Sequence, residues 1–261
     1  MKPLVRNILY YAALAGAVAL WFAATAASSA KRHLTSCHGV TVTVLDSASR
    51  RFVSRNDVKD YLKDYGLFVG QRVDSVNLSK IEFILNSKSA IRDCRAYITD
   101  DGTLHVDISQ REPVVRFQKG QTGFYADRSG FLFPLHKEFS APVPVVDGEV
   151  PLLAKKGFKG EPGSEKERQW LSRIIGLLDY MEQSGIWKEN ISEISVLESG
   201  DLVMIPREGS ERFIFGQPTA VKEKFERISR YYDTVAPRYE KGSCKLVDVR
   251  CKDQIICRKQ L

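Results

Sequence analysis

The sequence predicts an α+β protein in which an apolar N-terminal helix precedes two folded parts. Residues 7–30 contain no charged side chain, as a membrane-crossing helix requires. Residues 39–110 show strand and helix periodicities in the order β-α-α-β-β, and residues 111–261 contain short apolar runs between glycines and prolines, with two amphipathic helices. The composition, 43% hydrophobic and 27% charged among 261 residues, is typical of a folded protein with one or two domains.

Residues 7–30 are predicted to cross a membrane as one helix. At 1.5 Å per residue they span about 36 Å, which exceeds the thickness of a hydrocarbon core, about 30 Å. Tyr10, Tyr11 and Trp21 are side chains that favour the membrane interface. Positive charges flank both ends of the segment, so charge alone leaves its orientation open. A cleaved signal peptide is the alternative, because residues 24–26 read Ala-Thr-Ala, a cleavage pattern. Whether this segment stays as a membrane anchor or is cleaved as a signal peptide, the rest of the chain is expected to be exported across the membrane.

Residues 31–110 are predicted to form a small module. Val40, Val42 and Val44 lie on one side of an alternating strand. Ser54 and Asp57 form a capping-box pattern at the start of a first helix, and a second short helix is expected within residues 77–86. Alternating runs at 91–99 and 103–109 flank a DDG turn and predict a hairpin. Two helices can then cover one face of a three-stranded sheet.

Residues 111–261 are predicted to form a second, β-rich domain. Pro113 interrupts the preceding ladder, and strands or hairpins are expected at 123–135, 143–150, 191–206 and 212–216. One helix is expected from Glu165 to Gln183 and another from Pro218 onward. The apolar face of the second helix is predicted to contain Val221, Phe225, Ile228 and Tyr232.

The stretch CKLVDVRCKDQIICRK, residues 244–259, has the alternation of one β-strand with a single interruption. The side chains expected to face the domain are Val247, Val249, Cys251, Ile255 and Cys257, and those expected to face solvent are Leu246, Asp248, Arg250, Lys252 and Gln254. Asp253 falls in the inward register, so a bulge is expected near residues 252–254. Such a strand either is a protected edge that binds nothing or is an edge to which a partner strand is added.

Charge, cysteine spacing and motifs argue against several classes of function. The net charge of +7 comes from interleaved bases and acids without a strongly basic helix face, so nucleic-acid binding is not expected. The chain contains no GxSxG, HExxH, phosphate-loop or GxGxxG motif, and we expect no catalytic residues, cofactor or metal. The five cysteines include no CxxC pair, and Cys251 and Cys257 would lie about 20 Å apart on one uninterrupted strand. We expect five small, mostly buried, unpaired residues.

The order of these parts resembles the FtsQ/DivIB family of bacterial cell-division proteins. The likeness is carried by REPVVRF (111–117), YADRSGFLFPL (125–135), VPVVDG (143–148), FGQPTAVKEKFERISRYY (215–232) and KLVDVRCKDQIICR (245–258). The module at 31–110 is similar to a POTRA domain, and residues 111–261 are similar to the family's β domain. Cys251 stands where an aromatic residue is frequent in the family, so contacts made by that aromatic residue do not carry over.

The resemblance implies a non-enzymatic scaffold of the inner membrane. Residues 1–6 would be a short cytoplasmic tail, residues 7–30 the membrane helix, and the bulk would lie in the periplasm at the division septum. Partners would be the coiled-coil proteins of the FtsB/DivIC and FtsL types, which add a segment to the C-terminal strand, while the POTRA domain serves recruitment by earlier divisome proteins.

Two groups of residues are predicted to meet the partner. The residues on the closing strand are Leu246, Asp248, Arg250, Cys251, Lys252, Asp253, Gln254, Ile255 and Ile256. On the preceding helix, Arg227 and Arg230 could face an acidic partner helix. The alternative functions are a POTRA-bearing chaperone-like or transport module of the envelope, or a secreted binding protein if the N-terminus is cleaved.

Overall fold

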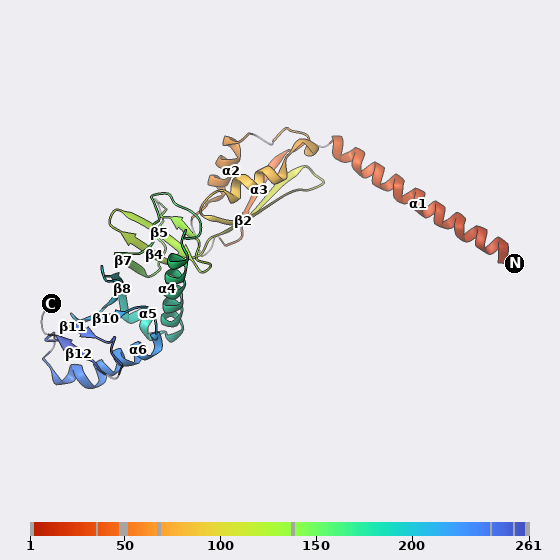
Figure 1. Ribbon diagram of the computed structural model, residues 1–261. Coiled ribbons are helices and arrows are strands. Elements are labelled where there is room, and N and C mark those ends of the chain that lie inside the picture. Colours follow the sequence, from red (N-terminus) through yellow and green to blue (C-terminus); the bar gives the residue numbers. More distant parts are fainter. Residues whose placement is uncertain are drawn as a thin grey trace. The chain divides into compact units, whose positions relative to one another are not determined.

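The computed structural model describes residues 3–34, 36–46, 52–66, 69–136, 139–240, 242–252 and 254–258. The chain divides into two compact units, Met1–Gln110 and Arg111–Leu261 (Figure 1). The predicted mixture of helices and β-sheets is confirmed, with one three-stranded and one nine-stranded sheet among the described residues.

The apolar N-terminal segment is helical, and helix α1 runs over Pro3–Leu34. The predicted helix at 7–30 lies entirely within it. Within the part of the chain that the structure describes, none of the helices combines the length and the apolar character that crossing a membrane requires.

The rest of the first unit follows the predicted β-α-α-β-β order, with one 3-10 turn between the helices. Its elements are β1 (Gly39–Val44), α2 (Arg55–Asp64), η1 (Val73–Ser75), α3 (Leu78–Asn86), β2 (Ile91–Ile98) and β3 (Thr103–Gln110). The predicted capping box of α2 is present, because Ser54 accepts a hydrogen bond from the backbone N–H of Asp57 and the Asp57 carboxylate accepts one from the backbone N–H of Ser54.

The sheet of the first unit has the order β1-β3-β2, with β1 parallel and β2 antiparallel to the central strand. Every second residue of β3 is buried, namely Leu104, Val106, Ile108 and Gln110. Helix α3 contributes Ile81 and Leu85, which are fully buried. The alternation of the strands and the 3.6-residue period of the helices therefore meet in one small core.

The second unit is built on the nine-stranded sheet in the order β12-β11-β10-β9-β8-β7-β4-β5-β6. The strands are β4 (Pro113–Lys119), β5 (Thr122–Asp127), β6 (Leu132–Pro134), β7 (Val145–Gly148), β8 (Ile191–Val196), β9 (Leu202–Pro206), β10 (Arg212–Gly216), β11 (Leu246–Asp248) and β12 (Ile256–Arg258). Most neighbours are antiparallel, but β4–β7, β7–β8 and β10–β11 are parallel pairs.

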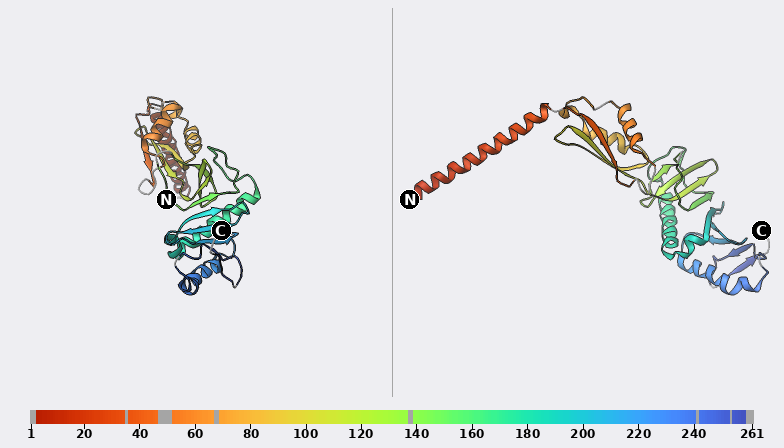
Figure 2. Two further views of the ribbon diagram at one scale, coloured as in Figure 1. Left: turned by 90° about the vertical axis from the view of Figure 1, so that its left-hand side faces the viewer. Right: turned by 180° about the vertical axis from the view of Figure 1, so that it is seen from behind.

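Three helices complete the core of the second unit: α4 (Glu165–Ser184), α5 (Ile186–Asn190) and α6 (Val221–Arg230). Their apolar side chains and those of one sheet face form a single hydrophobic cluster, in which Phe117, Phe213 and Phe225 are fully buried. Figures 1 and 2 show α6 beside the strands β11 and β12 in more than one orientation. Helix α6 therefore helps to position that end of the sheet.

The helix expected from Pro218 begins at Val221, and its predicted apolar face is wrong at the last position. Tyr232 is 38% exposed, whereas its neighbour Tyr231 is 4% exposed and packs in the core. Tyr231 stands three residues after buried Ile228, a spacing that also lies on one side of an α-helix. From this residue the helix continues as a π-helical turn, η2, over Tyr231–Val235, followed by a 3-10 turn, η3 (Ala236–Arg238).

The prediction of one closing strand is also wrong. The chain reverses after β11 and returns as β12, which pairs with β11 antiparallel, so that Val247 lies opposite Cys257. Leu246 and Asp248 are buried although solvent exposure was expected, and Cys251 is exposed although an inward position was expected. The expected inward and outward sides assume one continuous strand, and the reversal of the chain after β11 ends that alternation of side chains. Asp253, the expected site of the bulge, lies outside the described residues.

Candidate functional site

The edge strand β12 is the last strand of the nine-stranded sheet, and among the described residues it pairs only with β11. An edge strand leaves the backbone groups on its outer side available for another strand. The side chain of Ile256 is 36% exposed, and that of Arg258 is exposed as well. The predicted edge therefore exists, but it consists of β12 and not of one long strand over residues 246–257.

The ladder between β10 and β11 decides which backbone groups of β12 point outward. The N–H of Arg212 donates to the carbonyl of Lys245 (2.9 Å), and the N–H of Val249 donates to the carbonyl of Ile214 (3.1 Å). Backbone groups alternate in direction along a strand, so Val247 and Val249 use the β10 side of β11, as does the carbonyl of Lys245, whose N–H donates instead to the carbonyl of Arg258 on β12 (3.0 Å). Leu246 and Asp248 consequently face β12.

The partners of Leu246 and Asp248 on β12 are Arg258 and Ile256. These two residues direct their backbone groups inward, toward β11. By the same alternation, the N–H and C=O of Cys257 point to the open side. The N–H and C=O of Cys257 are therefore the backbone donor and acceptor to which an added strand would form hydrogen bonds.

A disulfide bond joins Cys244 to Cys257, with 5.5 Å between their Cα atoms. The expectation of five unpaired cysteines is wrong at this pair. Cys244 stands two residues before β11 and Cys257 is the middle residue of β12, so the reversal of the chain brings them within disulfide reach. Cys37 and Cys94 are buried and unpaired, and Cys251 is unpaired and exposed.

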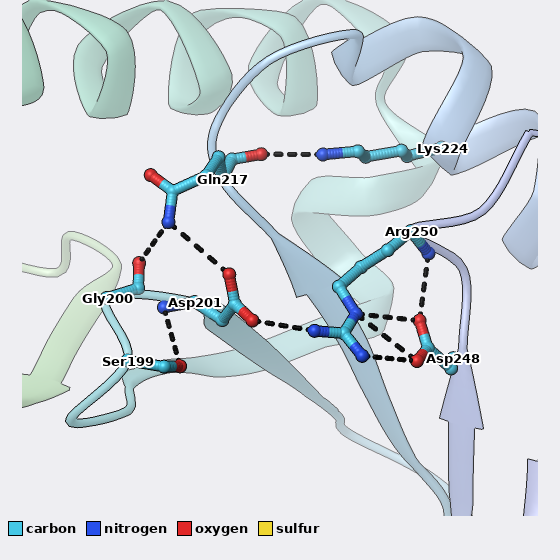
Figure 3. Close-up of polar contacts among 7 residues, drawn as sticks. All are labelled: Ser199, Gly200, Asp201, Gln217, Lys224, Asp248 and Arg250. Carbon is cyan, nitrogen blue, oxygen red and sulfur yellow. Dashed lines mark hydrogen bonds and ion pairs between the residues drawn. The ribbon is translucent and has the colours of Figure 1, made fainter.

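An arginine-centred cluster holds the end of β11, as Figure 3 shows. The guanidinium of Arg250 donates from Nε to Oδ1 of Asp248 (3.0 Å), from Nη2 to Oδ2 of Asp248 (2.7 Å) and from Nη1 to Oδ2 of Asp201 (2.8 Å). Asp248 is 2% exposed. Burial alone would raise the pKa of Asp248, but the hydrogen bonds and charge of Arg250 outweigh it and hold this pKa below its ordinary value.

The same cluster continues to the start of α6 through Gln217 and Lys224. The amide of Gln217 donates to the carbonyl of Gly200 (3.1 Å) and to Oδ1 of Asp201 (3.3 Å). The ammonium of Lys224 donates to the carbonyl of Gln217 (2.6 Å) and lies 4.9 Å from the centre of the Phe215 ring. Burial, followed by the nearby Arg227 charge, lowers the pKa of Lys224. These contacts tie the β8–β9 turn, the end of β10 and helix α6 together (Figure 3).

A basic cavity of about 480 Å³, in which five basic side chains outnumber the acidic Glu223 and Glu226, brings the two groups of predicted partner residues together. Its lining includes Arg227 and Arg230 of α6 and Arg250 and Lys252 of the segment after β11. Arg227 also donates from Nε to the carbonyl of Val249 (2.9 Å), so α6 is bonded directly to the end of β11. Helix and closing segment, predicted separately from the sequence, border one surface.

The predicted partner residues divide into structural and accessible ones. Leu246 and Asp248 are buried, and the guanidinium of Arg250 is engaged with two carboxylates. The accessible side chains are those of Arg230, Cys251, Lys252, Gln254 and Ile256, while Arg227 and Ile255 are half-buried. Asp253 lies outside the described residues.

Several residues that shape this edge were missed by the reading of the sequence. Asp201 and Gln217 carry no pattern that links them to residue 250, since they are 49 and 33 positions away along the chain. The polar KDQ stretch at 252–254 was a signal for the reversal, because it can be read as a turn, but Cys251 and Cys244 both precede it and the sequence does not say which of them meets Cys257. Among the described residues, no cluster of three or more His, Cys, Asp or Glu side chains is suited to a metal ion.

Comparison with known proteins gives two matches to family models. Residues 112–258 match the model described as FtsQ/DivIB, C-terminal related, and residues 35–109 match the POTRA-like domain. No curated protein matches the chain. The first match covers 147 of the 261 residues, from 112 to 258, which is more than half of the chain. The chain therefore belongs to the FtsQ/DivIB family of cell-division proteins, as its sequence motifs predicted.

Proposed function

We propose that this protein is a non-enzymatic scaffold of the cell-division machinery, anchored in the inner membrane, which binds a coiled-coil complex of the FtsB/DivIC and FtsL types. The partner segment adds as a strand to the outer side of β12. Division proteins that act earlier recruit this protein through its POTRA-like domain. In this way the protein links early and late steps of septum formation.

The observation that carries this proposal is the open side of β12. It terminates a nine-stranded sheet, and the backbone N–H and C=O of Cys257 point away from β11. Strand addition draws its affinity from such backbone groups and its selectivity from the side chains around them. The basic cavity beside the edge, lined by Arg230 and Lys252 among others, favours acidic side chains in the added segment.

The membrane anchor and the compartment rest on two features of the chain. Residues 7–30, within helix α1, lack any charged side chain and are numerous enough to cross a hydrocarbon core. The Cys244–Cys257 disulfide is typical of proteins outside the reducing cytoplasm. Together they support a single-pass protein with its N-terminus in the cytoplasm and its two folded units in the periplasm.

Site-specific photocrosslinking tests the docking edge directly. A benzophenone side chain at exposed Gln254, next to β12, is expected to crosslink to the purified coiled-coil complex. The matched control is exposed Arg128, which follows β5 near the opposite edge of the same sheet. The full-length protein in detergent or nanodiscs serves for both. Crosslinks at Arg128 with none at Gln254 would refute docking at β12.

Depletion in the source bacterium tests the cellular role. Filamentous cells without septa, with the protein at midcell, are the expected result. Normal septation after complete depletion would contradict the scaffold proposal and favour the envelope chaperone or transport alternative. Recovery of the protein from the culture medium, shortened at residues 24–26, would instead favour a secreted binding protein.

A further inference from the structure

We propose that the Cys244–Cys257 disulfide is a condition for partner docking, so that only the oxidised protein presents β12 as a receiving edge. The inference rests on the proposed function, because it concerns the regulation of that same edge. Three features of the structure lead to it: the weak attachment of β12, the position of Cys257, and the position of Cys244.

Strand β12 has few contacts of its own to hold it in the sheet. It spans Ile256–Arg258, pairs within the described part of the chain with β11 alone, and leaves two of its three side chains exposed. Cys257 and the preceding Ile255 pack partly against the core. Short edge strands with little buried area open readily.

The disulfide is attached at the residue that matters most for docking. Cys257 is the residue of β12 whose backbone N–H and C=O point outward, toward an added strand. A covalent bond at this residue fixes the donor and the acceptor together. Reduction of the disulfide therefore frees the backbone N–H and C=O with which a partner strand would form hydrogen bonds.

The other half of the disulfide is anchored firmly. Cys244 is 3% exposed and belongs to the hydrophobic cluster of the second unit. The bond closes a loop of 13 residues. Closure of a loop of this size shifts the equilibrium between a released and a held strand by roughly a hundred-fold in the chain-entropy account. Reduction is therefore expected to release β12 while the rest of the sheet stays folded.

The redox step has a simple balance. Two thiols, those of Cys244 and Cys257, lose two protons and two electrons as the sulfur–sulfur bond forms. A disulfide of an envelope oxidoreductase, or a small-molecule disulfide, accepts the electrons and protons and becomes a dithiol. A reducing dithiol reverses the reaction. Cys251 lies within the closed loop but takes no part in the bond.

The test uses the full-length protein in its oxidised form, after reduction with dithiothreitol, and as the variants Cys244→Ser and Cys251→Ser. Hydrogen–deuterium exchange of peptides covering residues 254–258 measures the edge without a partner. Reduction and Cys244→Ser should speed exchange there by roughly a hundred-fold. Cys251→Ser, the matched control, should leave it unchanged. Unchanged tryptophan fluorescence from Trp170 and Trp187, both in the second unit, shows that the fold is retained.

Binding of the purified FtsB/DivIC- and FtsL-type complex is measured on the same samples, and oxidised protein should bind roughly a hundred-fold more tightly than reduced protein. Equal exchange rates in both forms, or a native disulfide that uses Cys251, would overturn the inference. Faster exchange with equal binding in both forms would also overturn it. If neither form binds the complex, the proposed function fails, whereas the exchange data still decide whether the disulfide holds β12.

Discussion

Replacement of Arg250 by alanine isolates the energetic role of the cluster at the end of β11. In the folded protein, Asp248 receives hydrogen bonds from Nε and Nη2 of Arg250, and among the described residues one further bond comes from the backbone N–H of residue 250 (3.0 Å). Arg250→Ala leaves a 2% exposed carboxylate with that backbone donor alone. Asp201 loses its ion pair as well.

The expected loss of stability is about 2 kcal/mol. Removal of one partner from a fully buried ion pair costs about 3–5 kcal/mol. Because the Arg250 side chain is 43% exposed, solvent screens part of the interaction and the smaller value applies. Arg250→Lys retains the charge but not the forked geometry, and should lose about 1 kcal/mol. In the background Asp248→Asn, which leaves no buried charge, Arg250→Ala should be less destabilising by about 1 kcal/mol or more.

Urea unfolding followed by tryptophan fluorescence measures these differences, since Trp170 and Trp187 both lie in the second unit. A change of less than about 0.5 kcal/mol for Arg250→Ala would refute the reasoning. The result also bears on binding. If Arg250→Ala reduces partner capture in proportion to the loss of stability, the cause is a disordered strand end. Lys252→Ala is the control for the stability measurement, because this exposed side chain makes no hydrogen bond or ion pair among the described residues.

Three further predictions concern the same unit. The folded-state pKa of Asp248 is lowered, so its stabilising effect is complete above about pH 4 and is lost as the pH falls through that lowered value; Asp248→Asn should flatten the acid limb of a stability–pH profile. Lys224→Met keeps the apolar stem but removes one of the two donors to the carbonyl of Gln217, leaving the backbone N–H of Thr219 (2.7 Å), and should cost about 1 kcal/mol in urea unfolding. Ser164→Ala removes the cap of α4 and should cost about 1 kcal/mol, whereas Ser172→Ala on the exposed side of that helix should change little.

Local patterns were sufficient for most of the helices and hairpins. The capping box at residues 54–57, the apolar period of α3 and the DDG turn between β2 and β3 each involve neighbours in sequence, and each was predicted. The POTRA-like and FtsQ/DivIB matches agree with the family suggested by the motifs. Short-range interactions are legible in a sequence because the two partners are separated by a few residues at a known period.

The candidate site was predicted only in outline. The sequence indicated that residues 246–256 form an edge and, separately, that two arginines of α6 could face a partner, but it did not reveal which groups are accessible. Asp248 and Arg250, expected to face a partner, instead bind one another and Asp201. The sequence alone does not show whether the counterion of a charged side chain lies in solvent, in a partner, or 49 residues earlier in the chain.

The sequence by itself determined most of the strand and helix segments of both units, though not β4, α5 or the division of the closing segment into two strands, together with the charge-free character of residues 7–30 and the family. Tertiary structure alone decided that the closing segment reverses, that β10 and β11 run parallel, and that Cys244 meets Cys257. Each of these depends on a contact between distant residues, formed because the apolar face of the sheet must be covered and its backbone groups must be paired. Periodicity along the chain carries no record of such pairings, and so the open side of β12 became visible only in the folded protein.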